Sequence, residues 1–177
     1  MTKFGFSVVL ALTLGAAAPP EPSARAVAFI LAGAQPSVQA LAASLGSPDS
    51  RERIKAAMAL SEAGPSAKDA LPALTKALAD RNLNVRYFAG SALRGLGPAA
   101  ASAVPALMAM LKTFPGAVPE LEGPPRYFAD TRSVAAEALG AIGPAAKAAR
   151  PALAEALKDP SPDVREAAAE ALKKVGG

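Results

Sequence analysis

The residues that could perform chemistry in this chain are restricted, because the sequence contains no histidine and no cysteine. Without an imidazole or a thiol, the chain cannot form a Ser-His-Asp triad or a Cys-His pair, and it lacks the usual ligands of zinc. Without cysteine it also has no disulfide framework. Carboxylates and arginines are therefore the groups whose spacing must be considered.

Two sets of carboxylates are close enough in sequence to act together. Glu120 and Glu122 lie two residues apart in a segment rich in proline and glycine, whereas acid–base catalysis needs a rigid pair of opposed carboxyl groups. Asp159 and Asp163 bound a DPSPD segment whose oxygens could bind a divalent cation weakly. This pattern is more typical of a tight turn in which Asp163 is the N-cap of the last helix. We therefore predict that the chain is not an enzyme and carries no metal or cofactor.

Arginines recur at intervals of 33 residues once a 13-residue insertion is allowed for, at Arg53, Arg86, Arg132 and Arg165. Such a row could line a phosphate-binding surface. Residues 51–112 carry nine Lys/Arg against four Asp/Glu, a balance of +5, whereas residues 113–177 carry eight against nine. An excess of that size attracts anionic partners. We interpret the arginines instead as structural, because they lie in the register in which repeats stack, and the other charges as a mixed solvated surface.

The same 33-residue period runs through the chain and is its strongest signal. Gly64-Pro65, Gly97-Pro98 and Gly143-Pro144 mark one point of the period, at spacings of 33 and 46 residues, and the longer spacing contains the insertion. Each glycine stands where a helix C-cap requires a left-handed residue, and the proline prevents the helix from continuing. The apolar content is 51% with only 5% aromatic residues, and its abundance of alanine and leucine favours helices.

Leucines and small residues recur at fixed positions of the period and predict two amphipathic helices in each repeat. The first helix has leucines four residues apart, at Leu41 and Leu45, Leu74 and Leu78, Leu107 and Leu111, and Leu153 and Leu157. The second helix has Leu60, Leu93, Leu139 and Leu172, and three residues earlier Ala57, Gly90, Ala136 and Ala169, which allow helices to approach closely. We therefore predict an all-α solenoid of about four stacked antiparallel helix pairs over residues 35–177, with repeats at about 37–65, 66–98, 99–144 and 145–177.

These positions resemble HEAT repeats, in particular the short variety named after phycobilisome lyases. The motif of that variety is a proline in the first helix, an aspartate in the turn, and Val-Arg at the start of the second helix. It is complete in two repeats, as Pro72, Asp80 and Val85-Arg86, and as Pro151, Asp159 and Val164-Arg165. The third repeat keeps Pro105 and Arg132 but has Thr113 in place of the aspartate and Thr131 in place of the valine. The first repeat keeps only Arg53 and has Ser47 at the aspartate position.

The resemblance implies a fold and an inter-repeat ladder, but it implies little about function. In the family the turn aspartates and helix arginines form ion pairs between repeats. That role is carried over here to Asp80, Asp159, Arg53, Arg86, Arg132 and Arg165.

The insertion at about 113–125 is the segment that departs most from the repeat pattern, and insertions in solenoids often form the binding edge. It contains three large apolar side chains and is followed at once by an Arg-Tyr-Phe sequence, a combination typical of interface anchors. The candidate partner-binding residues are therefore Phe114, Leu121, Arg126, Tyr127 and Phe128. The alternative is that the aromatic side chains hold the loop against the helices. The related Tyr87 and Phe88 are expected to pack between helices.

Residues 1–34 are typical of a signal peptide and N-terminal segment. Lys3 precedes an uncharged apolar run at 4–18, which is short for a membrane span, and prolines follow. Small residues suitable for cleavage occur at Ala24-Arg25-Ala26 and at Ala32-Gly33-Ala34. We expect export to the periplasm or the extracellular space, with no stable membrane span after cleavage. The alternatives are an uncleaved anchor or an apolar helix that caps the solenoid.

The function that these patterns favour is a non-catalytic, exported scaffold that binds a protein partner, whose identity the sequence does not give. Self-association end to end is a further hypothesis. One alternative is an intracellular protein that binds nucleic acid or another anionic partner through residues 51–112. Another, suggested only by the name of the family variety, is a lyase or accessory factor for a chromophore-bearing protein.

Overall fold

The described part of the chain is built from helices arranged as successive pairs. The computed structural model describes residues 36–113 and 130–176, which lie in the unit Pro36–Gly177. The expected signal segment at 1–34 lies outside the described residues. Within them the secondary structure is helical throughout, and the elements follow in the order α2 (Val38–Ser44), α3 (Ser50–Glu62), η1 (Gly64–Ala70), α4 (Leu71–Ala77), α5 (Leu83–Leu96), η2 (Gly97–Ala103), α6 (Val104–Leu111), α7 (Thr131–Ile142), η4 (Gly143–Ala149), α8 (Arg150–Ala156) and α9 (Pro162–Val175).

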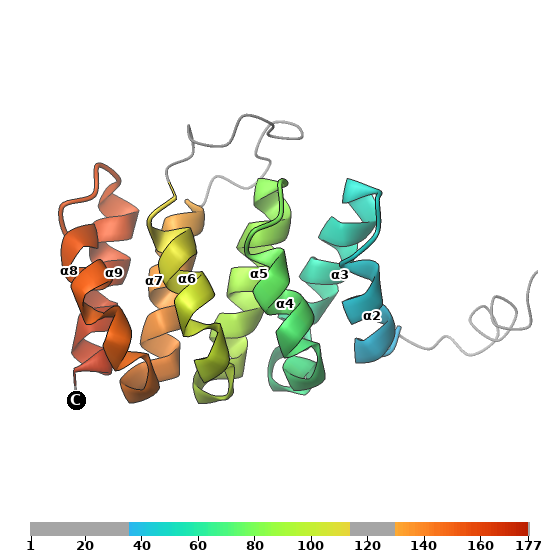
Figure 1. Cartoon of the computed structure of the whole chain (residues 1–177), viewed down its shortest axis with the longest axis horizontal. Coiled ribbons are helices and arrows are strands. Elements are labelled where there is room, and N and C mark those ends of the chain that lie inside the picture. The colour runs from blue at the N-terminus through green and yellow to red at the C-terminus, as the bar shows by residue number, and fades with distance from the viewer. Residues whose placement is uncertain (1–35, 114–129, 177) are drawn as a thin grey trace, which may run out of the picture. The chain divides into compact units, whose positions relative to one another are not determined.

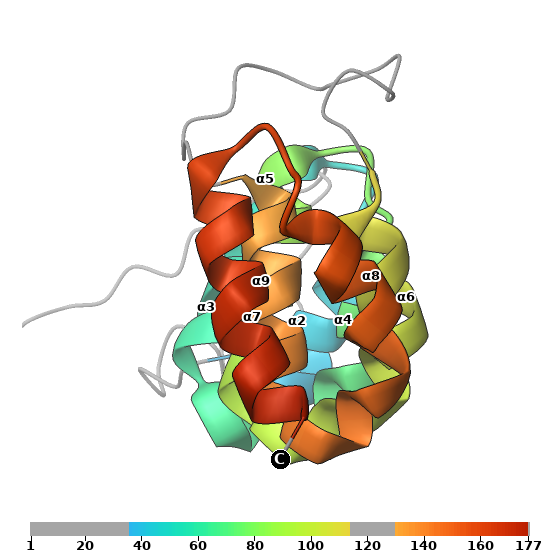
Figure 2. The ribbon, with the colours of Figure 1, turned by 90° about the vertical axis from the view of Figure 1, so that its left-hand side faces the viewer.

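The pairs stand side by side in two layers, from α2 and α3 at one end to α8 and α9 at the other (Figure 1). The second helices α3, α5, α7 and α9 pack on one another in sequence and form one layer. The first helices α2, α4, α6 and α8 form the other layer, as the view along the stack shows (Figure 2). The predicted α-solenoid of stacked helix pairs is confirmed. None of the helices in the described ranges is both long and apolar enough to cross a bilayer.

The Gly-Pro pairs connect one repeat to the next through a short 3-10 helix. Gly64, Gly97 and Gly143 all have positive φ, of 53°, 56° and 72°, and each is the first residue of η1, η2 or η4, with proline as the second. The expected left-handed C-cap is wrong in one respect, because ψ is −132° at Gly97 and −140° at Gly143. A residue before proline is excluded from helical ψ values, so these glycines adopt an extended conformation with positive φ that only glycine tolerates.

The core follows the leucine register in the middle of the stack and weakens at its ends. Leucines of the central repeats are fully or almost fully buried, among them Leu74, Leu78, Leu93, Leu107, Leu111 and Leu139. Leu41 and Leu172, in the first and last repeats, are only partly buried. Leu157 is 41% exposed, although its counterparts Leu78 and Leu111 are 4% exposed. The difference arises because those two leucines are covered by the following repeat.

The second helices approach one another closely at glycines. A Cβ atom on Gly90 would lie 2.8 Å from Cγ1 of Val134, so the predicted role of this small residue in close packing is confirmed. Gly140 has the same role at the next interface, where a Cβ atom would lie 2.9 Å from the Cα atom of Ala171. Tyr87 and Phe88 form an edge-to-face pair at 5.3 Å on α5, with Phe88 buried, as expected for interhelical packing.

Capping residues begin most of the second helices, with one exception. Asp130 is the N-cap of α7 and accepts a hydrogen bond from the backbone N–H of Arg132. The prediction that Asp163 is the N-cap of the last helix is wrong, because α9 begins at Pro162 and Ser161 is its N-cap residue. Proline suits the first helical position, where a backbone N–H would have no partner within the helix. Asp163 therefore lies inside the first turn, where its negative charge interacts favourably with the helix dipole.

Candidate functional site

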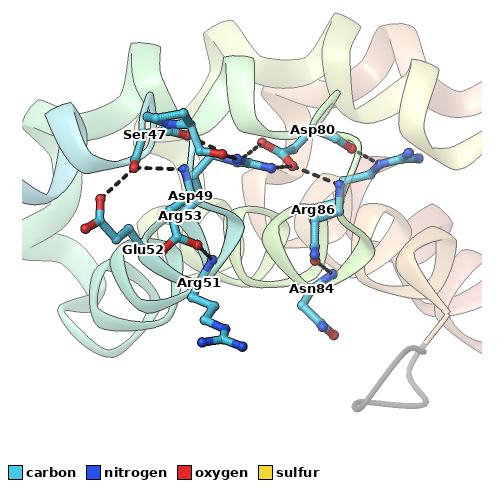
Figure 3. A network of polar contacts seen from close by, with 10 residues as sticks. Ser47, Asp49, Arg51, Glu52, Arg53, Asp80, Asn84 and Arg86 are labelled. Carbon is cyan, nitrogen blue, oxygen red and sulfur yellow. Dashed lines mark hydrogen bonds and ion pairs between the residues drawn. The ribbon is translucent and has the colours of Figure 1, made fainter. Parts of the chain in front are cut away.

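The second helix of each of the first three repeats carries a buried arginine in its first turns. In the first repeat, Arg53 donates from Nε and Nη2 to the two carboxylate oxygens of Asp80 in the next repeat, at 2.9 and 3.1 Å. Its Nη1 donates to the backbone carbonyls of Ser47 and Pro48 in its own turn, at 3.0 and 3.1 Å. Figure 3 shows this arginine between the two turns. The guanidinium group therefore ties its own turn to the following repeat through a two-point ion pair.

A second inter-repeat ion pair joins the third and fourth repeats. Arg132 donates from Nη1 to Asp159 at 2.6 Å, and its Nε donates to Asp130 at 3.0 Å. Both carboxylates are largely buried. Burial of Asp130 opposes its ionisation, but the hydrogen bonds and the positive charge of Arg132 together outweigh that effect, so the pKa of Asp130 lies below its ordinary value. The hydrogen bond to Asp130 in turn raises the pKa of Arg132.

The turn aspartates also fix the conformation of their own turns. Oδ1 of Asp80 accepts a hydrogen bond from the N–H of Asn82 at 2.8 Å, and Oδ1 of Asp159 accepts one from the N–H of Ser161 at 2.8 Å. This side-chain turn is typical of aspartate, which bonds the backbone two residues on. Each of these carboxylates therefore fixes the turn before a second helix and also accepts hydrogen bonds from the arginine of the preceding repeat.

The structure places the other two arginines of the sequence pattern differently. Arg86 is buried, and its Nε donates to the backbone carbonyl of Asp80, whose side chain is occupied by Arg53. Arg165 is exposed, and its Nη1 donates to the carbonyls of Asp159 and Pro160 at 2.8 and 2.9 Å. Arg86 and Arg165 thus contact backbone carbonyls in their own turns and no carboxylate among the described residues.

The basic residues of 51–112 do not form a uniform cationic surface. Arg53 and Arg86 are buried, and Arg94 on α5 forms an ion pair with Glu137 on α7. Lysine and arginine side chains bind nucleic acid by neutralising phosphates, which requires accessible and uncompensated charges. Burial and pairing therefore reduce the cationic area on which the nucleic-acid alternative depends.

A groove lies along the layer of second helices and was not among the predicted sites. It has a volume of 660 Å³ and is lined by residues of α5, α7 and α9. Small residues, Gly140, Ala141, Ala167 and Ala171, leave room between the helices. Its charged lining consists of Glu137, Asp163, Glu166 and Glu170 against Arg94 and Lys174. The groove therefore carries an excess of negative charge.

A helical spacing in the sequence could have indicated this groove. Asp163, Glu166 and Glu170 follow one another at intervals of three and four residues, which places them on one face of α9. Glu170 also accepts a hydrogen bond from Lys173 on the same helix, at 2.6 Å. Lys174 remains on the groove side, where its positive charge is one of two basic groups in the lining.

The candidate partner-binding residues of the insertion, Phe114, Leu121, Arg126, Tyr127 and Phe128, lie outside the described residues. The possible cation site in the DPSPD turn can be examined, since that turn is described. There Asp159 is engaged by Arg132 and by the backbone of Ser161. In the described ranges no group of three or more carboxylates is placed to hold a metal ion.

The fold and its ladder define a class of helical-repeat protein, and comparison of the sequence gives the family. The sequence pattern of HEAT repeats matches residues 38–122 and 115–177. The chain therefore belongs to the HEAT-repeat family, as its sequence resemblance predicted. No curated protein sequence matches the chain.

Solved structures support the same fold. Two engineered proteins match with TM-scores of 0.60, at 23% and 22% identity, over 85% and 86% of this chain. The chain spans 65% and 40% of their lengths. The complex of CpcE and CpcF of phycocyanin lyase from Nostoc sp. PCC7120 matches with a TM-score of 0.51 and 23% identity, over 90% of this chain and 70% of that one. At this level of identity the similarity concerns the fold.

Proposed function

We propose that the chain is a non-catalytic, exported scaffold that binds a protein partner, and that the groove of α5, α7 and α9 receives a basic segment of that partner. The observation that carries the proposal is the groove itself, with four acidic and two basic side chains above a floor of small residues. Complementary charge directs association and excludes like-charged partners. The acidic lining repels nucleic acid and favours lysine or arginine side chains.

The arrangement of the groove also suits a partner larger than a metabolite. Its charged side chains come from three consecutive repeats, and those of α9 are exposed. A solenoid presents such a surface because each repeat contributes an equivalent helix face. A structural neighbour of this chain is a complex of two named protein chains, CpcE and CpcF, and this supports an interaction role for the fold.

Export is supported by the sequence of residues 1–34 alone. The order of Lys3, an uncharged apolar run at 4–18 and small residues before Val27 and Gln35 matches the order of a signal peptide. A protein exported by this route has its partner in the envelope or outside the cell. Mass spectrometry of the mature N-terminus, after fractionation of the native host, tests this part of the proposal independently of binding.

The binding part is tested by capture of partners with the full chain tagged at its C-terminus. The variant Asp163→Asn/Glu166→Lys changes two exposed groove residues, and Asp69→Asn/Glu62→Lys makes the same charge change at exposed positions outside the groove lining. We expect the groove variant to lose at least tenfold in affinity for the captured partner and the matched control to bind normally. Equal binding by both variants contradicts a role for the groove.

Three further outcomes separate the alternatives. A variant that lacks residues 114–125 should still bind through the groove, and loss of binding in that variant would place the site on the insertion instead. An intact Met1 in the cytoplasm, together with bound nucleic acid whose affinity falls steeply with salt, would favour the nucleic-acid alternative. A catalysed reaction on a chromophore-bearing protein would favour the lyase alternative.

A further inference from the structure

The ladder has a gap between the second and third repeats. The two ion pairs of the ladder, Arg53 with Asp80 and Arg132 with Asp159, each span 27 residues. The same step from Arg86 leads to Thr113, at the end of the first helix of the third repeat. A threonine at that position supplies no negative charge. Arg86 is therefore the buried arginine that faces a threonine where the repeat pattern has a carboxylate.

Arg86 nevertheless occupies the buried ladder position. The residue is 6% exposed, and its Nε donates a hydrogen bond to the backbone carbonyl of Asp80. Among the described residues no acceptor contacts its Nη1 or Nη2. Figure 3 shows these two nitrogens pointing away from the Asp80 carboxylate. In the described ranges no fully buried side-chain nitrogen or oxygen lacks a hydrogen bond, so both nitrogens keep an accessible surface.

That surface belongs to a cavity between the first helices of the second and third repeats. The cavity has a volume of 290 Å³ and is lined by Arg86 and Thr113 together with Thr75 and apolar side chains of α4 and α6, among them Leu78 and Met110. The hydroxyls of Thr113 and Thr75 donate to the carbonyls of Ala109 and Leu71, at 2.9 and 2.8 Å, so Arg86 supplies the donors that a carboxylate needs. Arg86 is the one charged residue in the lining. A carboxylate that enters this half-open, largely apolar pocket lies beside a single cation, where water screens their attraction less than on an open surface.

We propose that this cavity is a carboxylate-binding site in which Arg86 binds an acidic side chain that comes from outside residues 36–113 and 130–176. A guanidinium group presents a planar fork of donors that matches the two oxygens of a carboxylate. Arg53 binds Asp80 in that way one repeat earlier. Burial lowers the pKa of Arg86, with the charge of Asp80 opposing the effect, and a second carboxylate would relieve the desolvation of the cation.

The site is distinct from the groove of the proposed function, since the two have no lining residue in common. Two sources could supply the carboxylate: a partner protein, or Glu120 and Glu122, which follow Thr113 in this chain. The chemistry is the same in both cases. The test therefore first detects whether Arg86 binds a carboxylate and then identifies where that carboxylate comes from.

The test is an NMR titration of the full-length chain with sodium glutarate, compared with sodium chloride at equal ionic strength. The probe should produce a saturable shift of the Arg86 side-chain Nε–Hε resonance and of the Thr113 amide, and chloride should produce none. The variant Thr113→Asp supplies the missing ladder carboxylate within the chain. It should abolish the glutarate shift and raise the melting temperature, which also shows that the variant is folded.

A parallel titration of the variant Glu120→Gln/Glu122→Gln identifies the source. A shift in the wild-type chain means that the site is open to an acidic group of a partner. A shift only in the double variant means that the chain's own glutamates occupy Arg86, and the carboxylate site stands in either case. Absence of the shift in both proteins, or its persistence in Thr113→Asp, would overturn the proposal.

Discussion

Gly140 of α7 lies so close to α9 that a Cβ atom on it would be 2.9 Å from the Cα atom of Ala171 and 3.1 Å from its Cβ atom. The nearest contact is with backbone, which cannot rotate away as a long side chain can. The spacing of the third and fourth repeats therefore depends on the absence of a side chain at this position. Because α7 and α9 both line the groove, the same glycine helps to set its width.

The first prediction concerns this contact. Gly140→Ala should lower the free energy of unfolding by about 1–3 kcal/mol, the usual cost of an extra methyl group in a packed interface. The measurement is chemical denaturation followed by circular dichroism.

Gly95→Ala is the matched control for that substitution. Gly95 also lies within a second helix, α5, but its added Cβ atom would be 3.5 Å from the nearest atom, an ordinary contact. Here alanine should stabilise the chain by up to about 1 kcal/mol, because alanine favours helices more than glycine does. Equal effects of the two substitutions would show that helix propensity, and not interhelical contact, governs both sites.

A second prediction addresses the ion pair of Arg132 and Asp159. Asp159→Asn keeps an oxygen for the turn hydrogen bond to Ser161 but removes the charge that faces Arg132. We expect a loss of about 1–3 kcal/mol in the free energy of unfolding, because a buried cation loses one of its two carboxylates.

A double-mutant cycle with Arg132→Met isolates the coupling between these two side chains. A coupling of at least about 1 kcal/mol is expected. Glu170→Gln removes the exposed pair with Lys173 and should leave stability almost unchanged, since such a pair is screened by water. A coupling near zero would mean that stacking does not depend on the ladder.

The third prediction follows from the lowered pKa of Asp130. A carboxylate whose pKa is lower in the folded than in the unfolded state contributes stability above its ordinary pKa of 3.8, and this stability is lost as the pH falls through the folded pKa. The free energy of unfolding should therefore decrease as the pH falls below about 4.

The variant Asp130→Asn tests the assignment. It should be less stable than the wild-type chain at pH 7, and the difference should diminish as the pH is lowered, because the wild-type carboxylate becomes neutral. Urea denaturation at pH 7 and at pH 3 measures both values. A difference that stays constant across this range would assign the acid sensitivity to other carboxylates.

The fourth prediction compares two leucines that share one position of the repeat. Leu78→Ala should cost about 2–5 kcal/mol, because Leu78 is 4% exposed and its truncation leaves a cavity. Leu157→Ala should cost about 1 kcal/mol or less, because Leu157 is 41% exposed. Thermal denaturation of the two variants checks the difference. Equal losses would mean that Leu157 is covered in solution, for example by self-association, and light scattering would then show a concentration-dependent mass.

Some of the functional surface could be read from the sequence and some could not. The recurrence of Arg53, Arg86, Arg132 and Arg165 is visible as a spacing, and so is the acidic face of α9. The groove is different, because it is formed where residues of α9 meet Arg94 on α5 and Glu137 on α7. No pattern within one helix reports the distance to residues two repeats earlier.

The class of fold follows from the sequence alone, because a 33-residue recurrence of leucine, small residues and Gly-Pro leaves stacking of helix pairs as the way to bury the apolar faces. The sequence did not determine that Arg53 and Arg132 have carboxylate partners in the next repeat while Arg86 and Arg165 contact carbonyls. Equal spacing makes the four arginines look equivalent, but the partner of each is set by the residue that the neighbouring repeat brings against it. Burial, charge pairing and the volume of the groove are properties of the stack, because they depend on which residues of neighbouring repeats come into contact.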